Sequence, residues 1–493
     1  MHGDDTIHTH FFWHGPRMWA ISAAAGIAAG FGLTYLLPPA YADAGAVAPS
    51  IPLPLVAPFA VLLLSIAIGP LVRPRAWHRH FPDVAFFLGA IVATYYLAGY
   101  SRPGFEGTKS YGATMALHAG MEYYAFIALV GGLFVVSGGV LIDLKGRAGP
   151  IFNCVLLGIG AVLANVVGTT GASMLLIRPF MRANEGRLTP LHVVFFIFIV
   201  SNCGGCLTPI GDPPLYLGYI KGVPFEWTLL HLWGDWLFTN GLLLVLFFVV
   251  DTVMEKRVAD RRREAGQPAL APAVALPRVS IRGKVGLICL GLMIGGVFVD
   301  PLLHHVAPHL PHLPYGATFQ IMVAVVSYLL APRDILARND FSFFPVKEVG
   351  LLFLGIFLTM MPALGYLAAN GHKLGLDTPT AFYYGTGALS AVLDNAPTYL
   401  NFLQVAVPTD LNKSTIAAFL ADPSGKGIRE LMAISTGAVF FGAMSYIGNG
   451  PNFMVRTIAE TAGVRMPSFF VYTFWACLLL LPILVAQWYL FIR

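Results

Sequence analysis

The chain has 493 residues, of which 57% are hydrophobic and only 11% are charged. A water-soluble globular protein has about 25% charged residues, so this composition excludes a soluble domain. The net charge of +5 is small for this length and gives no indication of nucleic-acid binding. Apolar runs of roughly 18 or more residues recur along the chain, which is the pattern of membrane-spanning helices.

The first apolar run extends from Met18 to Leu37 and leaves two interpretations open. It is followed by Ala40 and Ala42, whose Ala-x-Ala spacing is typical of a signal-peptidase site. Only Arg17 supplies a positive side chain before the run, which is little for a signal peptide. Residues 1–42 are therefore either a cleaved signal peptide or an additional first helix.

The rest of the chain divides into two similar halves, 43–251 and 284–493, joined by a polar linker at 252–283. In the first half we expect spans at 53–72, 82–100, 122–142 and 229–251, an interrupted segment at 150–182 and a broken span at 190–220. In the second half we expect spans at 284–301, 317–332, 346–370 and 469–491, an interrupted segment at 379–406 and a broken span at 430–462.

The distribution of basic residues favours treating both interrupted segments as re-entrant hairpins. Each half then has five crossings, so the halves enter the membrane with opposite orientation. With the linker in the cytoplasm, the cytoplasmic loops hold 18 Lys and Arg and the opposite loops hold 7, as the positive-inside rule requires. The expected fold is an all-α polytopic membrane protein of two inverted repeats, each with five spans and a hairpin, and with broken helices at the midplane.

The breaks are the expected functional site. Irregular backbone at membrane depth must be buried in protein or line a cavity, and inverted-repeat transporters bind their cargo at such breaks. The four breaks are ANVVGTTGAS at 164–173, SNCGGCLTPIGDPP at 201–214, LDNAPT at 393–398 and SYIGNGPN at 445–452. When the breaks of the two halves are compared, Asn165 corresponds to Asn395. The segment that begins at Gly211 corresponds to the one that begins at Gly448.

Four acids lie at membrane depth or at its edge, namely Glu122, Asp212, Glu348 and Asp394. Intramembrane carboxylates are costly and are functional candidates. Asp394, at a hairpin tip, is placed to carry either a proton or a sodium ion, or else to cap the second arm of the hairpin. Asp212 precedes two prolines and fits a helix N-cap equally well.

The runs LTPIGDPPLYLGYIKGVPF at 207–225, LDNAPT at 393–398 and GTTGASMLLIRPF at 168–180 resemble the ion transporter superfamily. Its members include divalent anion/sodium symporters, citrate–metal symporters, arsenite permeases and D-type sodium/proton antiporters. The chain is most similar to bacterial proteins described as sodium:proton antiporters or citrate transporters, over roughly residues 50–490. The resemblance implies a scaffold domain and a transport domain in each protomer, a homodimer and an elevator motion.

One departure from the family concerns the hairpin tips. In the dicarboxylate branch each tip carries Ser-Asn-Thr. Here the first tip reads Ala164-Asn165-Val166 and the second reads Leu393-Asp394-Asn395. A fixed negative charge near the site disfavours a di- or trianion and favours a cation or a proton.

We therefore expect a secondary sodium/proton antiporter of the bacterial inner membrane, with sodium ions and protons as its only small-molecule requirement and the bilayer as its surroundings. Asp394 and Asp212 form the expected proton/cation site, and sodium ligands come from Asn165, Asp394 and Asn395. The other expected ligands are Thr169, Thr170, Asn202, Thr208, Gly211, Thr398, Gly448, Asn449 and Asn452.

The alternative is a sodium- or proton-coupled symporter of citrate or a dicarboxylate, in which helix N-termini hold the anion. An enzyme is not expected, because no nucleophile and base are paired in the sequence of the breaks. The chain also contains no GxxxxGK[ST] run, which argues against a nucleotide-driven pump.

Overall fold

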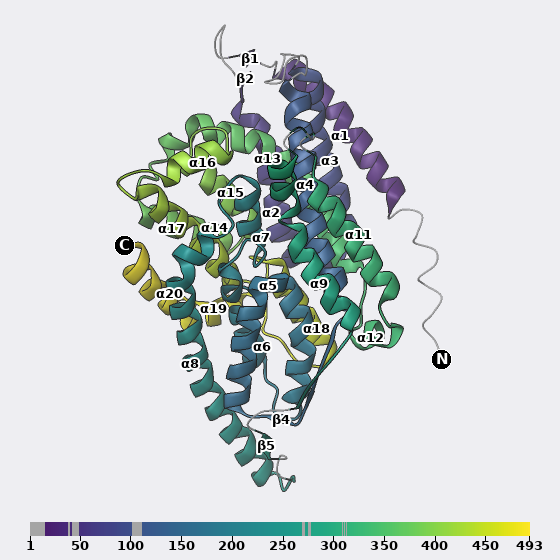
Figure 1. Cartoon of the computed structure of the whole chain (residues 1–493), viewed down its shortest axis with the longest axis vertical. Helices are drawn as coiled ribbons and strands as arrows, with labels where there is room; N and C mark the ends of the chain where they lie inside the picture. The colour runs from purple at the N-terminus through teal and green to yellow at the C-terminus, as the bar shows by residue number, and fades with distance from the viewer. Residues whose placement is uncertain are drawn as a thin grey trace. The chain divides into compact units, whose positions relative to one another are not determined.

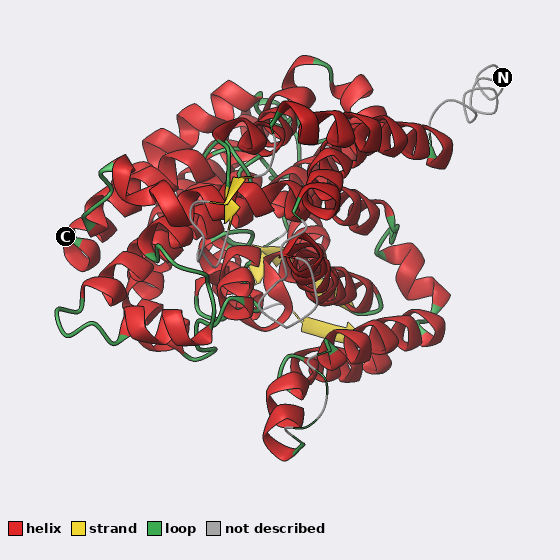
Figure 2. Cartoon of the chain, turned by 90° about the horizontal axis from the view of Figure 1, so that it is seen from above, coloured by secondary structure: helices red, strands yellow, loops and turns green. Residues whose placement is uncertain are grey.

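The computed structural model describes residues 15–37, 40–41, 49–100, 111–268, 272–274, 278–307, 309, 311 and 313–493. Ala42, part of the expected cleavage site, lies outside them. In the described residues the chain is almost entirely helical, with only short strands (Figure 2). Among the helices that the structure describes, seven are long and apolar enough to cross a membrane, or eight if the bent pair at 469–479 and 481–492 is one span. The expectation of a helical multi-pass membrane protein is therefore confirmed.

The chain forms two units, and the first consists of residues 1–125, 346–375 and 407–410. Its described elements are α1 (Pro16–Leu36), β1 (Ala40–Tyr41), β2 (Pro49–Ser50), a 3-10 turn (Leu53–Val56), α2 (Ala57–Val72), α3 (Pro74–Gly99), the first half of α4 (Tyr111–Gly138), most of α13 (Phe344–Asn370) and a 3-10 turn (Gly371–Leu374).

Within this unit, α1 and α3 lie side by side (Figure 1). The contact is close because glycines of α1 face the α3 backbone. A Cβ at Gly26 would lie 2.4 Å from the Phe87 carbonyl oxygen, and one at Gly30 would lie 2.7 Å from that of Ile91. Small residues allow this approach between membrane helices.

The second unit consists of residues 126–345, 376–406 and 411–493 and holds all the expected site residues. Its elements in the first part of the chain are the rest of α4, β3 (Leu141–Lys145), β4 (Arg147–Ala148), α5 (Pro150–Ala183), α6 (Pro190–Ile199), η2 (Cys203–Cys206), α7 (Pro213–Ile220), α8 (Trp227–Glu264), β5 (Ala273–Val274) and β6 (Arg278–Arg282). The later ones are α9 (Lys284–Gly296), α10 (Val299–Val306), α11 (Tyr315–Leu330), α12 (Arg333–Arg338), α14 (Pro379–Ser390), α15 (Asn395–Ala406), α16 (Lys413–Leu420), α17 (Lys426–Phe441), η4 (Gly442–Met444), α18 (Gly450–Thr461), α19 (Phe469–Leu479), α20 (Leu481–Gln487) and a π-helical turn (Trp488–Ile492).

Most helices overlap the expected segments, and four differences stand out. Helix α4 begins at Tyr111, eleven residues before the span expected at 122–142. The polar linker expected at 252–283 is partly helical, because α8 continues through its first residues to Glu264. The span expected at 284–301 is broken between α9 and α10. The linker also contributes β6, which pairs antiparallel with β3.

Three of the four helix breaks contain glycine or proline, whereas the one between α14 and α15 contains neither. Helix α5 is kinked at Gly168, whose φ of 78° and ψ of 155° are not helical and suit a residue without a side chain. The break between α6 and α7 contains the η2 turn. The break between α14 and α15 lies at 391–394, and that between α17 and α18 contains η4.

Candidate functional site at the broken helices

The centre of the site is the carboxylate of Asp212, which is only 1% exposed. Asp212 is the N-cap residue of α7, but its side chain makes no hydrogen bond to its own helix. The reason is local, because Pro213 and Pro214 occupy the first two helical positions and proline has no N–H to donate. The carboxylate is thus available to other parts of the chain.

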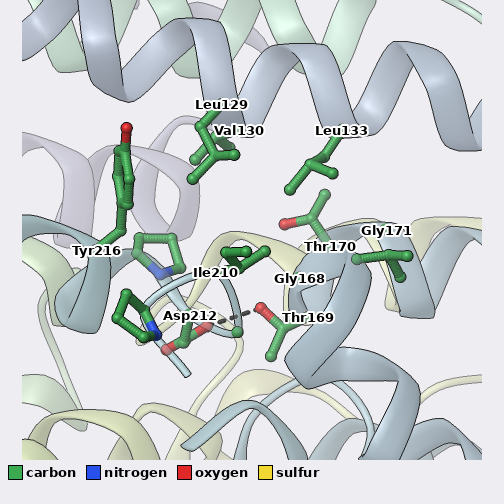
Figure 3. A pocket seen from close by; sticks show the side chains of 14 residues that line it. Leu129, Val130, Leu133, Gly168, Thr169, Thr170, Gly171, Ile210, Asp212 and Tyr216 are labelled. Carbon is green, nitrogen blue, oxygen red and sulfur yellow. Dashed lines mark hydrogen bonds between the residues drawn. The ribbon is translucent and has the colours of Figure 1, made fainter. Parts of the chain in front are cut away.

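Three side chains from three separate segments donate hydrogen bonds to this carboxylate. Thr169 Oγ1 donates to Asp212 Oδ1 at 2.7 Å, and a dashed line in Figure 3 marks this hydrogen bond. Asn449 Nδ2 lies 2.9 Å from the same oxygen, and Asn395 Nδ2 lies 2.7 Å from Oδ2. All three donors are neutral, and in the described part of the chain no Lys, Arg or His forms an ion pair with Asp212. An ionised carboxylate buried without a countercharge is costly.

The same kind of backbone hydrogen bond joins the α5 kink to the segment before α7 and the start of α15 to the segment before α18. The Thr169 amide donates to the Gly211 carbonyl oxygen at 2.7 Å, and the Asn395 amide donates to the Gly448 carbonyl oxygen at 3.1 Å. Thr169 is therefore the counterpart of Asn395 in this pattern, where the sequence alignment had placed Asn165. The reason is that the backbone leaves the helical conformation at Gly168, three residues beyond Asn165, so that Thr169 is the first residue after the break.

Asn165 instead braces the turn that precedes Asp212. Its side-chain nitrogen donates to the Gly204 carbonyl oxygen at 2.7 Å and to its own helix, and its side-chain oxygen accepts from the Leu207 amide at 2.7 Å. Thr208 Oγ1 donates to the Asn165 carbonyl oxygen at 2.6 Å and accepts from the Gly211 amide at 3.1 Å. Both Asn165 and Thr208 shape the backbone, and neither contacts the carboxylate.

A second layer of amides joins the break between α6 and α7 to the break between α17 and α18. Asn202 Nδ2 donates to Asn452 Oδ1 at 2.7 Å, and Asn449 Nδ2 lies 3.2 Å from Asn202 Oδ1. Asn452 Nδ2 in turn donates to the carbonyl oxygens of Gly442 and Ser445, at 2.8 Å each. These side chains are buried, so the network fixes the position of Asn449 beside Asp212.

Asp394 makes the contacts of a helix cap. Its carboxylate accepts from the Ala396 amide at 3.0 Å, and its carbonyl oxygen accepts from Thr398 Oγ1 at 2.9 Å. The side chain is half-buried, whereas that of Asp212 is buried. The structure therefore places Asp212 at the centre, with Asp394 one residue away from its partner Asn395.

A small pocket opens beside this carboxylate, lined by α4, the α5 kink and the segment before α7 (Figure 3). Thr170 and Tyr216 line it with Asp212, and Leu129 and Leu133 of α4 form its apolar wall. The centre of a water molecule can occupy about 20 Å³ of it, which is room for about one water molecule or a small ion.

Two further features show what the site can hold. Asn395 Oδ1 is buried and has no hydrogen-bond partner in the described residues, so an acceptor oxygen is left free beside Asp212. Helices α7, α15 and α18 also begin here, and helix N-termini favour negative charge. Among the described residues, no three His, Cys, Asp or Glu side chains converge as they would around a transition metal.

Two buried acids of α8, Asp235 and Asp251, are missing from the four acids singled out in the sequence. Both are fully buried. Asp251 binds His192 at 2.9 Å and also contacts Arg187. Asp235 could have been singled out from its position inside an apolar run, where a carboxylate has a high free-energy cost.

Residues 48–492 match a family described as "Putative citrate transport". The chain belongs to this family. It is 27% identical over 346 residues to an uncharacterised transporter of Mycobacterium bovis and equally to one of Mycobacterium tuberculosis. A 46 kDa membrane protein of Mycobacterium leprae is 26% identical over 348 residues. Each match covers 67% of this chain and 74% of the relative.

Membership of this family, the transporter relatives and the apolar helices together make the chain a multi-pass membrane transporter. This agrees with the kind of protein that the resemblance implied, and with the expectation that the chain is not an enzyme.

Proposed function

We propose that this transporter exchanges a small cation, in the first place sodium, for protons across the bacterial inner membrane. The observation that carries the proposal is the carboxylate of Asp212, which is buried and bound only by neutral donors. Such a carboxylate is neutralised equally well by a proton or by a sodium ion, but not by both at once. Because the two ions compete for one carboxylate, their movements across the membrane are coupled without ATP.

The neighbouring oxygen atoms supply a coordination shell for the cation. Asn395, which donates to Asp212, has a side-chain oxygen Oδ1 without a hydrogen-bond partner among the described residues. Thr169 and Thr170, but not Asn395, line the pocket beside Asp212. Oxygen ligands of this kind suit a hard cation. The volume beside Asp212 also fits a small ion better than citrate. Asp394 adds a second negative charge near the site and is assigned a supporting role.

We further propose the inverted-repeat architecture for this function, with repeats at 43–251 and 284–493, hairpins at 150–182 and 379–406, and the linker in the cytoplasm. Supporting this assignment, the amide-to-carbonyl bond between Thr169 and Gly211 recurs between Asn395 and Gly448. The corresponding N-caps, Asp212 and Asn449, are each followed by a proline within two residues. A homodimer working by alternating access completes the proposal.

A cation-coupled citrate or dicarboxylate symporter is the second candidate. Two observations favour it: the description of the family and the meeting of three helix N-termini, those of α7, α15 and α18, at one place. Helix N-termini bind carboxylates through their free N–H groups. In this reading a cation at Asp212 would reduce the repulsion of the organic anion.

The deciding experiment uses the full chain in liposomes that contain a pH-sensitive dye. After a proton gradient is imposed, external sodium is expected to change the internal pH. The response is expected to be lost in Asp212→Asn and to persist in Asp394→Asn, which keeps a capping oxygen for α15. A response that survives in Asp212→Asn and disappears in Asp394→Asn would move the shared site to Asp394. The absence of a pH response, together with sodium-driven uptake of labelled citrate, would overturn the antiporter.

A further inference from the structure

A second buried carboxylate lies in α8, away from the residues that bind Asp212. Asp235 is fully buried, and its Oδ1 accepts a hydrogen bond from Gln487 Nε2 of α20. Gln487 Oε1 in turn accepts from the Tyr383 hydroxyl of α14 at 2.6 Å. Three helices that are far apart in the sequence are thus joined by one chain of buried polar groups.

The other oxygen of this carboxylate is left without a donor. In the described residues Asp235 Oδ2 has no hydrogen-bond partner. Thr239 Oγ1, one helical turn further along α8, is also fully buried and has none. Residues i and i+4 of a helix share one face, so an unpaired acceptor and an unpaired hydroxyl lie on the same side of α8.

The groups around Asp235 do not supply a countercharge. Its titratable neighbours are Tyr383 from α14 and Cys206 from the η2 turn. His231, one turn earlier on α8, is engaged with the Trp227 carbonyl oxygen at 2.8 Å. No Lys or Arg forms an ion pair with Asp235 in the described part of the chain. An ionised Asp235 would carry its charge in a dry environment with one neutral donor, which is costly.

We propose that Asp235 is a second proton-binding site of this transporter, which holds its proton on Oδ2 while α8, α14 and α20 are packed together. Oδ2 makes no hydrogen bond with the Thr239 hydroxyl in this structure, and a proton on Oδ2 removes a buried charge that has no countercharge. When the carboxyl ionises, the proton passes to water. The bond from Gln487 becomes stronger, and the uncompensated buried charge favours an arrangement of α8, α14 and α20 that admits water to Asp235. The site is independent of which solute the protein carries.

The position of α8 connects this proton site to the turn that shapes the Asp212 site. Trp236 Nε1 donates to the Gly204 carbonyl oxygen at 2.7 Å, and Asn165 Nδ2 donates to the same oxygen at 2.7 Å. Asn240 Nδ2 lies 3.2 Å from the Cys203 carbonyl oxygen. A change in the packing of α8 is therefore transmitted to η2 through two contacts next to Asp235 in the sequence.

Infrared spectroscopy of the full chain in membranes tests the proposal without reference to transport. A protonated carboxyl group has a carbonyl stretch that a carboxylate lacks. At neutral pH this band is expected in the wild type and in Asp212→Asn, and its Asp235 component is expected to be absent in Asp235→Asn. Gln487→Leu should shift the Asp235 component of the band, because it removes the donor to Oδ1. Identical carboxyl bands in Asp235→Asn and the wild type would overturn the proposal.

The pH profile of transport gives a second readout. Asp235→Asn is close in size to the wild-type side chain and keeps an oxygen for Gln487, so it is expected to fold. Its profile should be displaced by about one pH unit or more, since the carboxyl no longer titrates. Tyr383→Phe, which removes only the end of the hydrogen-bond chain, should displace the profile less. An unchanged profile in Asp235→Asn would contradict a role in transport, whereas failure of the Asp212 experiments would leave the infrared result standing.

Discussion

Asp212 and Asn449 are the N-cap residues of two half-helices, α7 and α18, and their side chains are hydrogen-bonded to each other, with Asn449 Nδ2 2.9 Å from Asp212 Oδ1. One member of the pair is an acid and the other is the amide of the same shape. The joint between the two broken spans therefore holds one carboxylate. Two carboxylates there would repel each other, and two amides would provide no group that can bind and release a proton.

The substitution Asn449→Asp tests this pairing. It places two carboxylates within hydrogen-bond distance in a buried site, where one must retain a proton. The folded state then binds more protons than the unfolded state at high pH, so stability falls as pH rises. We expect the thermal midpoint of the detergent-solubilised variant to fall between mildly acidic and alkaline pH by several degrees more than that of the wild type. Parallel curves for the two proteins would contradict the single-charge arrangement.

A substitution at Thr169 measures how much one hydrogen bond to Asp212 contributes to stability and transport. Thr169→Val keeps the shape of the side chain and removes the hydroxyl, which leaves a buried acceptor with one donor fewer. Such a loss costs about 1–3 kcal/mol, and we expect a lower thermal midpoint and weaker sodium-dependent proton movement. Thr169→Ser retains the hydroxyl and serves as the control. If the valine and serine variants transported equally well, the hydroxyl would have no part in the site.

The glycines of the two breaks are required because the backbones approach closely. A Cβ at Gly211 would lie 2.1 Å from the Gly205 carbonyl oxygen, and one at Gly448 would lie 2.5 Å from that of Ser390. Replacing either glycine by alanine forces the backbone apart, at a cost of about 1–3 kcal/mol, and should abolish transport. Gly450→Ala is the matched control, because no atom lies within 4 Å of its added Cβ. Wild-type transport by Gly211→Ala or Gly448→Ala would show that the close approach is not needed.

The buried ion pair of Asp251 and Arg187 holds α8 to the loop that follows α5. Asp251 also accepts from Asn153 Nδ2 at 2.8 Å. Asp251→Ala leaves the buried guanidinium without its nearest partner and should destabilise the protein by about 3–5 kcal/mol. The exposed pair of Arg282 and Asp334, at 2.8 Å, provides the control, since Asp334→Asn should cost about 1 kcal/mol or less. Thermal unfolding in detergent compares the two. Equal losses would mean that burial of the Asp251 pair does not set its contribution.

Local sequence patterns predicted most of the helices and the places where they break. Long apolar runs have few alternatives to a helix in a membrane, because the backbone must satisfy its own hydrogen bonds there. Glycine and proline mark the interruptions directly, as at Gly168 and Pro213. The sequence could not predict that β3 pairs with β6, since residues 141–145 and 278–282 meet only through the arrangement of the helices between them.

What the sequence by itself determined is the class of protein, a helical multi-pass membrane protein, and the set of polar residues in the segments where its helices break. Only the tertiary structure decided which acid is central. Asp394 and Asp212 have similar local surroundings, an acid at the start of a half-helix. The Asp394 carboxylate accepts a hydrogen bond from the Ala396 amide of its own helix. The prolines after Asp212 have no N–H to donate. The Asp212 carboxylate is therefore bound by three side chains from distant segments, those of Thr169, Asn395 and Asn449. A hydrogen-bond partner supplied by distant segments is a property of the packing, and no local pattern in the chain encodes it.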